Sequence, residues 1–302
     1  MTGEGTPGHA RSAVRTWRGR ADYLAAYDAV LAQWPVTFES VDVPAPSGTT
    51  HVRVCGPRDG RPLVLLHGGG ATSAVWFANV GELSRTHRVY AVDTIGDAGR
   101  SVAERPIDGL PGFMGWLDGL FDALGLGGAS LCGHSYGGWL ALNYALHAPR
   151  RVRRLALLEP TDCFAGLRTG YRLRAVPTLV RPNPERIRAL ITWETGGIGV
   201  DPAWLNLMSL GGGFPTAKTV MPRRPAPDRL RASTVPTLLL LAERSRAHDI
   251  HRVSANAREL MPHAVRTILP GVSHHAVPTE RPGQLDRALG AFLVETGGSA
   301  EA

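Results

Sequence analysis

ASLCGHSYGG, residues 129–138, carries the pattern G-x-S-x-G where an apolar run passes into a helical segment. The run 129–132 is typical of a buried strand, and residues 136–147 are typical of a helix. A serine on such a strand–turn–helix corner is held with its hydroxyl exposed above the sheet. The flanking glycines suit a turn so tight that side chains there would collide with neighbouring backbone. The segment therefore predicts an exposed nucleophile at Ser135, while an ordinary Gly-Ser turn is the alternative interpretation of the same sequence.

Two further segments complete a pattern around this serine. Upstream, the apolar run 61–66 opens into His-Gly-Gly-Gly at 67–70. Downstream, the run 267–269 opens into Pro-Gly-Val-Ser-His at 270–274. A glycine-rich loop after the third strand, a serine on a sharp turn and a late histidine follow the chain order of the alpha/beta-hydrolase superfamily, which this sequence resembles. The resemblance implies a mostly parallel eight-stranded sheet with helices on both faces.

The remaining periodicity fits that fold. Strands are predicted at 36–43, 49–55, 61–66, 88–92, 129–132, 155–158, 237–241 and 265–269. The first two form a hairpin with a longer turn at 44–48. Helices are predicted at 21–33, 74–84, 113–124, 136–147 and 250–260. Because several strands are uniformly apolar and alternate with helices, we expect a mainly parallel sheet with both faces covered.

Between residues 160 and 235 the alternation of strands and helices stops. Roughly 75 residues are too many for a structureless loop in a compact domain. We expect a mostly helical lid, inserted after the sixth strand and lying over Ser135; a segment that only packs on the surface is the alternative. The core then comprises 21–159 and 236–296, with a disordered arm at 1–20 and a tail at 297–302.

Length and composition limit the function classes. The 302-residue chain has a formal charge of +7, but its arginines are dispersed and no motif that reads nucleic acid accompanies them, so we expect no nucleic-acid partner. No apolar run approaches the roughly 18 residues of a membrane span, and the N-terminus lacks the apolar segment of a secretory signal. The three cysteines cannot pair completely, which favours a reduced, cytoplasmic setting. The oligomeric state stays open.

Most parts of the expected site have one clear candidate. Ser135 needs a base within hydrogen-bond reach, because a neutral hydroxyl is a weak nucleophile. His274 is the expected base, and its neighbour His275 is the alternative. The backbone N–H groups of Gly69 and Tyr136 are expected to form the oxyanion hole.

The acidic member of the catalytic triad has three candidates. Hydrolases of this type usually carry an Asp or Glu just after the seventh strand, but the matching stretch 242–245 reads AERS and places serine there. We favour Glu159, which ends an apolar run, because a carboxylate buried there needs a polar partner. Some members of the superfamily carry their acid after the sixth strand, as Glu159 would be. Glu243 and Asp249 remain alternatives, although Asp249 also fits the N-cap of the following helix.

Three residues are candidates for binding the substrate. His134, inside the turn, either lines the acyl pocket or has a structural role, and Trp193 and Trp204 are expected to shape the pocket from the lid. The run HDIH at 248–251 is a poor zinc set, since two histidines at i, i+3 lack a second cluster of ligands. No GxxxxGK or GxGxxG follows a strand. We therefore expect no metal and no cofactor.

A closer resemblance, to small bacterial carboxylesterases of this fold, is visible in 93–97, in the turn around Ser135 and in 242–249. It covers most of 36–292 and is weakest in the lid. It implies a serine hydrolase that cleaves small to medium carboxylic esters through an acyl-enzyme. The alternatives are a thioesterase, lactonase, C–C hydrolase or biosynthetic cyclase on the same triad, or a ligand-binding protein of this fold with little turnover.

Overall fold

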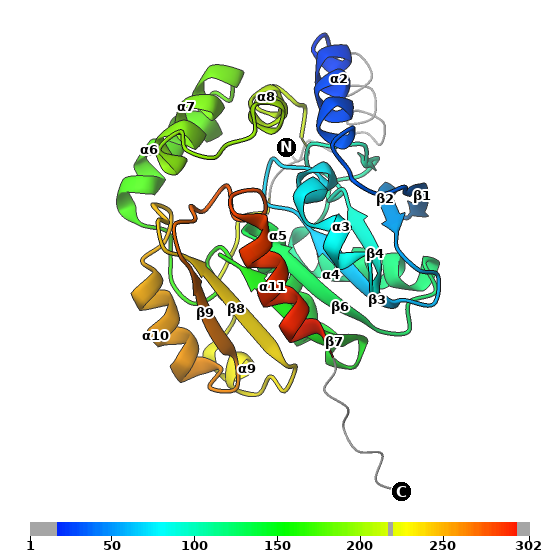
Figure 1. The fold of residues 1–302 in the computed structure, drawn as a ribbon, viewed down its shortest axis with the longest axis vertical. Coiled ribbons are helices and arrows are strands. Elements are labelled where there is room, and N and C mark those ends of the chain that lie inside the picture. Colours follow the sequence, from blue (N-terminus) through cyan, green and yellow to red (C-terminus); the bar gives the residue numbers. More distant parts are fainter. Residues whose placement is uncertain (1–16, 217–219, 295–302) are drawn as a thin grey trace, which may run out of the picture.

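A twisted sheet forms the centre of the computed structural model, which describes residues 17–216 and 220–294 (Figure 1). The strands in these ranges are β1 (Glu39–Ala45), β2 (Gly48–Cys55), β3 (Arg61–Leu66), β4 (His87–Val92), β5 (Val102–Ala103), β6 (Ala129–His134), β7 (Val152–Leu158), β8 (Thr237–Ala242) and β9 (Val265–Leu269). Their order is β1-β2-β4-β3-β6-β7-β8-β9, and β5 pairs with β2. All pairs from β4 to β9 along this order are parallel, whereas β2 is antiparallel to β1, β4 and β5.

The eight predicted strands are present, and the predicted fold class is confirmed; β5 is an additional short strand. The prediction of a longer hairpin turn was wrong, because Ala45 already pairs with Gly48 and only two residues connect the strands. Gly48 has a φ of +139°, and a Cβ there would lie 2.0 Å from the carbonyl oxygen of Val102. Glycine at this position therefore lets β5 pair against the end of the hairpin.

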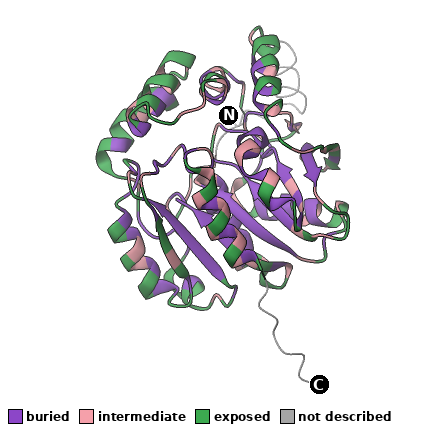
Figure 2. Cartoon of the chain, in the orientation of Figure 1, coloured by how far each residue is buried: buried purple, intermediate pink, exposed green. Residues whose placement is uncertain are grey.

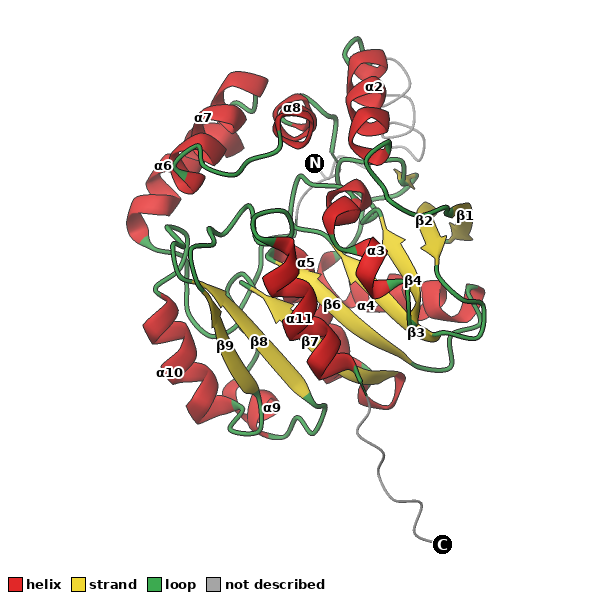
Figure 3. Cartoon of the chain, viewed as in Figure 1, coloured by secondary structure: helices red, strands yellow, loops and turns green. Residues whose placement is uncertain are grey.

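Helices surround the sheet (Figure 3). They are α2 (Arg20–Leu31), α3 (Val80–Leu83), α4 (Gly109–Ala123), α5 (Tyr136–His147), α6 (Thr169–Val180), α7 (Pro184–Thr195), α8 (Pro202–Gly211), α9 (Pro227–Arg231), α10 (Ile250–Leu260) and α11 (Pro282–Leu293), with 3₁₀ turns η1 (Ser73–Ala78) and η2 (Pro149–Arg151). The helix predicted at 74–84 is divided between η1 and α3. In the described ranges, no helix combines the length and the apolar character needed to cross a membrane.

Both faces of the central strands β3, β6, β7 and β8 are buried (Figure 2), as is usual for parallel strands, whereas the edge strands β1 and β9 are largely exposed. Along β3, Val64 and Leu66 join the apolar cluster that contains residues of α4, α5 and α10. Leu63 and Leu65 point to the opposite cluster, which contains residues of η1, α3 and α11. This two-residue alternation fixes the register of the strand, and hence the position of the loop that follows it.

Between β7 and β8, the helices α6, α7 and α8 stand apart from the sheet (Figure 1). We call the described residues of 160–226 the cap. Within it α7 packs on both α6 and α8, and α8 also packs on α2. The last helix of the segment, α9, packs on α10 instead. Most of the expected N-terminal arm (residues 1–16) and the expected tail at 297–302 lie outside the described residues, while α2 begins at Arg20.

Candidate active site

The turn after β6 gives Ser135 an unusual backbone conformation. Its φ of 52° and ψ of −112° lie in a region that costs a non-glycine residue about 1–3 kcal/mol. A Cβ on Gly133 would lie 2.3 Å from the carbonyl oxygen of Gly137, and a Cβ on Gly137 would lie 2.3 Å from that of Leu66. Glycine alone permits this approach of β6, α5 and β3, which explains the G-x-S-x-G spacing. The strained serine is held by its amide, which donates to the carbonyl of Leu158 at 2.9 Å.

Ser135, His274 and Glu159 form a continuous chain of polar contacts. The Oγ of Ser135 lies 3.1 Å from Nε2 of His274, and Nδ1 of His274 lies 3.2 Å from Oε2 of Glu159. Because a carboxylate only accepts hydrogen bonds, Nδ1 carries the ring proton and Nε2 offers its lone pair to the serine hydroxyl. Glu159 is fully buried and His274 is 3% exposed, so water does not compete for this contact. The arrangement can accept a proton from Ser135.

Glu159 directly follows β7 and is held by the end of β8. The amide of Ala242 donates to its Oε1 at 2.9 Å, and the hydroxyl of Ser245 donates to its Oε2 at 2.6 Å. Burial raises the pKa of Glu159, while the nearby imidazole of His248 and these two hydrogen bonds act against that rise. Ser245, which stands where related hydrolases were expected to carry an acid, thus supports a carboxylate from the neighbouring strand.

The other two candidate acids have different partners. Glu243 is exposed and accepts a hydrogen bond at 2.7 Å from a backbone amide in the loop after β9. Asp249 is also exposed and caps α10 by accepting from the amide of Arg252 at 3.1 Å. Of the three carboxylates, Glu159 is the one within hydrogen-bond reach of His274.

Burial also controls the protonation of His274. Removal of the imidazolium from water lowers the pKa of His274 to about 3, and the charge of His275 acts in the same direction. The negative charge of Glu194 partly opposes both effects. At neutral pH the ring is therefore uncharged, which is the form that a general base needs.

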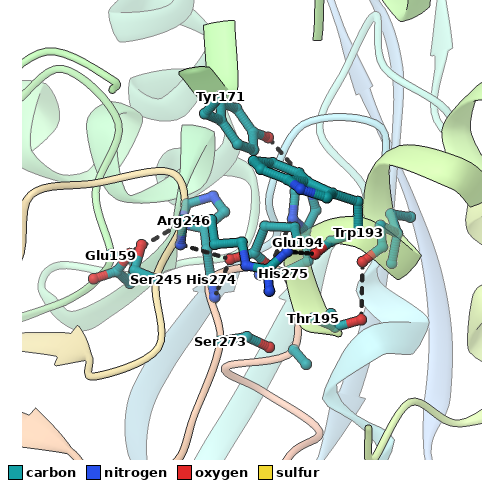
Figure 4. A network of polar contacts seen from close by, with 12 residues as sticks. Glu159, Tyr171, Trp193, Glu194, Thr195, Ser245, Arg246, Ser273, His274 and His275 are labelled. Atoms are coloured by element: carbon teal, nitrogen blue, oxygen red, sulfur yellow. Dashed lines mark hydrogen bonds and ion pairs between the residues drawn. The ribbon is translucent and has the colours of Figure 1, made fainter. Parts of the chain in front are cut away.

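A buried carboxylate from the cap holds the loop that carries both histidines (Figure 4). Oε1 of Glu194 accepts from the amides of His274 at 3.0 Å and of Arg246 at 3.1 Å. Oε2 accepts from the amide and from Nδ1 of His275, at 3.1 and 3.2 Å. Burial alone would raise the pKa of Glu194, but the hydrogen bond and charge of His275 outweigh it and hold that pKa well below its usual range. His275, the alternative base, thus faces the cap, and its Nε2 lies 3.3 Å from the hydroxyl of Tyr171 on α6.

Sequence reasoning did not identify Glu194 or Tyr171. Glu194 is the penultimate residue of α7, a helix of mixed polarity in which an acidic residue is ordinary. Its function depends on the docking of α7 against a loop about 80 positions later in the chain. The one sequence feature that pointed near Glu194 was its neighbour Trp193, which was expected to shape the substrate pocket.

The loop after β3 brings Gly69 beside Tyr136, the first residue of α5. A Cβ on Gly69 would lie 3.6 Å from the Cβ of Tyr136. The next amide, that of Gly70, donates to both carboxylate oxygens of Asp97, at 2.9 and 3.2 Å. His67 ties the same loop to the loop after β4, since its Nε2 accepts from the amide of Thr94 at 2.9 Å. These contacts fix the amide of Gly69 next to the turn that carries the serine.

His134 supports the site from below the turn. Its side chain is 5% exposed, and its Nε2 donates to the carbonyl oxygen of His274 at 2.8 Å. Burial lowers the pKa of His134 well below the ordinary histidine value, so the ring stays neutral. The geometry favours the structural role over the pocket-lining role that the sequence left open.

Trp193 and Trp204, which were expected to shape the pocket, make contacts of other kinds in the cap. Arg174 and Arg246 both lie over the ring of Trp193, with guanidinium carbons 4.5 and 5.2 Å from its centroid. Trp204 is 2% exposed and belongs to the apolar cluster that the cap shares with α2 and the core. Neither contact shows an exposed pocket wall, and both are contacts that stabilise the cap.

Residues 63–288 match the alpha/beta hydrolase family. Because this match spans most of the chain, and because the sheet order and the turn at Ser135 agree with it, the chain belongs to the alpha/beta hydrolase family. The expected superfamily is therefore confirmed.

Within the family, the chain is similar to carboxylesterases of Bacillus subtilis. It is 30% identical over 287 residues to carboxylesterase YbfK, a match that covers 90% of this chain and 93% of the relative. It is 29% identical over 295 residues to the uncharacterized carboxylesterase nap, with 91% and 93% covered. The crystal structure of naproxen esterase (carboxylesterase NP) superposes with a TM-score of 0.85 at 28% identity, covering 92% of this chain and 99% of that one.

Proposed function

We propose that this chain is a serine carboxylesterase that cleaves small to medium carboxylic esters through an acyl-enzyme. The observation that carries the proposal is the relay from Ser135 through His274 to Glu159, with contacts of 3.1 and 3.2 Å. The names of the relatives, which cover nearly the whole chain, support ester bonds as the target. Fold alone would not choose between esters and other acyl substrates.

The reaction follows from the contacts. Ser135 attacks the ester carbonyl while Nε2 of His274 accepts its proton, and the imidazolium then protonates the leaving alkoxide. Water repeats the sequence on the acyl-enzyme and releases the acid. Glu159 holds Nδ1 in the correct tautomer and stabilises the imidazolium. The amides of Gly69 and Tyr136 donate to the oxyanion, each worth roughly 10²–10³ in rate.

We also propose that the segment 160–235, through the cap, acts as the lid of this site. Three contacts support the assignment. Glu194 holds the histidine loop, a Cβ on Gly211 would lie 3.3 Å from the carbonyl oxygen of Gly70, and the hydroxyl of Tyr136 donates to the carbonyl of Val220 at 2.9 Å. Substrate must then enter past the cap, which would set its size range.

A reducing, cytoplasmic setting is part of the same proposal. Cys55, Cys132 and Cys163 are all buried and free of disulfides. Burial raises the pKa of the Cys132 thiol, which keeps the thiol protonated and unreactive. Free, inert cysteines are typical of proteins kept in reducing compartments.

A short-chain p-nitrophenyl ester tests the activity. The enzyme should release a burst of p-nitrophenol equal to one per active chain, followed by steady turnover. Ser135→Ala should lose the burst, the turnover and covalent labelling by a fluorophosphonate, while its circular dichroism spectrum stays that of the parent. A protein that binds the ester but releases no p-nitrophenol would contradict the proposal, and normal labelling of Ser135→Ala would move the nucleophile elsewhere.

A further inference from the structure

His248 is a buried histidine to which the reaction gives no task. Its side chain is 2% exposed, and neither ring nitrogen has a hydrogen-bond partner among the described residues. An imidazole buried without partners costs stability, on the order of 1–3 kcal/mol for each unsatisfied polar group. Burial lowers its pKa to about 4, so the ring is neutral at pH 7 and keeps a free lone pair. A ligand that bound to this lone pair would remove the cost of burying the His248 ring without a partner.

The fold places this ring beside two residues of the relay. One donor atom each of Glu159, His248 and His274 lie within 4.8 Å of one another. The ring centroids of His248 and His274 are 5.2 Å apart. In the sequence, the potential metal ligands next to His248 are Asp249 and His251, but both of these side chains are exposed. The fold therefore assembles a different set: two imidazoles and one carboxylate, all buried.

These distances approach those of a zinc site. Zinc–nitrogen and zinc–oxygen bonds of about 2.0–2.2 Å in a tetrahedron place two ligand atoms roughly 3.3 Å apart. Nδ1 of His274 and Oε2 of Glu159 already have that spacing, at 3.2 Å. The ring of His248 has no hydrogen bond to break as it moves inward, among the residues that the structure describes. Glu159 is held from behind by Ala242 and Ser245, as carboxylate ligands generally are.

We propose that Glu159, His248 and His274 form a binding site for a divalent transition-metal ion, zinc above all, and that the bound ion switches the enzyme off. Two histidines and one glutamate are a zinc-binding set that leaves the fourth position open for water. Magnesium and calcium are disfavoured, because they prefer oxygen ligands.

The inhibition follows from the tautomer of His274, and this step rests on the proposed function. In the free enzyme Nδ1 carries the proton and Nε2 the lone pair that faces Ser135. An ion bonded to Nδ1 uses the lone pair of that atom, so the ring proton must move to Nε2. The ring stays neutral and no net proton is released, but it can no longer accept the proton of Ser135. Removal of the ion by a chelator restores the active tautomer.

Calorimetric titration of the metal-free chain with Zn²⁺ tests binding without any substrate. The parent chain should bind one ion, and His248→Gln should bind it at least ~10-fold more weakly, since even the loss of a residue that supports a ligand costs that much. His251→Gln is the matched control: it is the same residue type three positions further along the chain, but exposed and in the first turn of α10, and it should bind like the parent. The absorption spectrum of bound Co²⁺ should report a tetrahedral site in the parent and the control.

Inhibition of ester hydrolysis by Zn²⁺ is measured in a second experiment. Zn²⁺ should inhibit ester hydrolysis by the parent and by His251→Gln, reversibly on addition of a chelator, and should inhibit His248→Gln only at concentrations at least ~10-fold higher. Equal Zn²⁺ affinity in the parent and His248→Gln would overturn the proposal. If His248→Gln fails to fold, Glu159→Gln replaces it in the calorimetry, and undiminished binding there has the same meaning. If no ester is hydrolysed but one Zn²⁺ still binds through His248, the proposed function fails while the metal site stands.

Discussion

Two buried carboxylates hold His274 from different regions of the molecule. Glu159 belongs to the core, directly follows β7 and contacts the imidazole ring. Glu194 belongs to the cap, lies on α7 and contacts the backbone of the histidine loop. Both are shielded from water, with 0% and 1% exposure. The core carboxylate therefore sets the tautomer of the His274 ring, whereas the cap carboxylate fixes the position of the loop that carries His274.

The two contacts differ in how they depend on the rest of the fold. The end of β7 lies next to β6, which carries Ser135, so strand pairing alone brings Glu159 to the site. Glu194 reaches the loop only while α7 is docked. Cap position and histidine position are thus coupled, and a change in the cap can reach the relay without touching substrate.

The largest effect is expected from the core carboxylate. Glu159→Gln should lower kcat by about 10³–10⁴ with little change in KM, because an amide neither stabilises the imidazolium nor enforces the productive tautomer. Steady-state kinetics on a short acyl ester measure it. Glu243→Gln, the same substitution at an exposed glutamate close by, should stay active. A fully active Glu159→Gln would show that Glu159 does not act on His274 during the reaction.

A second substitution sharpens the assignment. Ser245 contacts the same carboxylate oxygen as His274 does. In the Glu159→Gln background, Ser245→Asp should restore part of the lost kcat, because a carboxylate would again lie near Nδ1. A correctly folded double variant with no recovery would mean that the end of β8 cannot present a charge to the ring.

The cap carboxylate should have an intermediate effect. In Glu194→Gln one oxygen becomes an amide that faces N–H donors, so two of the hydrogen bonds to the loop are lost and the charge disappears. A cost of about 1.4–2.7 kcal/mol lowers kcat roughly 10- to 100-fold, with a smaller change in KM. Glu185→Gln, at an exposed glutamate in the first turn of the same helix, is the control and should match the parent. Equal activity of the two variants would show that the loop holds itself without the cap.

The pH dependence separates the two regions again. Burial lowers the pKa of His274 to about 3, so the acid limb of kcat/KM should lie well below the ordinary value of ~6.5, and activity should be nearly constant from about pH 5 to 8. Glu194 opposes that shift, so Glu194→Gln should move the limb further toward acid. Because its own pKa is lowered, Glu194 contributes stability at neutral pH that is lost below about pH 4. Half-maximal activity near pH 6.5 would show a water-exposed imidazole instead.

The same contrast explains what the sequence could predict. The strands, the turn at Ser135 and the late histidine are local patterns, and parallel pairing brings their ends to one edge of the sheet. Glu159 could be named because a carboxylate ending an apolar run needs a partner. Glu194, Ser245 and His248 could not be given roles, because their contacts join positions far apart in the chain through side-chain packing that periodicity does not encode. The two-residue hairpin turn was missed because its close contact with β5 is also long-range.

The smallest effect is expected at Asp249, the candidate acid whose carboxylate caps a helix of the core. Its carboxylate accepts from the amide of Arg252 and caps α10. Asp249→Ala should therefore cost about 0.5–2 kcal/mol of stability, while Asp249→Asn should cost almost nothing, since asparagine caps equally well. Both variants should keep the parent kcat at a temperature where they remain folded. Thermal unfolding followed by circular dichroism measures the first effect and ester hydrolysis the second. Asp249→Asn removes the negative charge but keeps the helix cap. If this variant lost kcat while its stability stayed that of the parent, Asp249 and not only Glu159 would act on the imidazolium of His274.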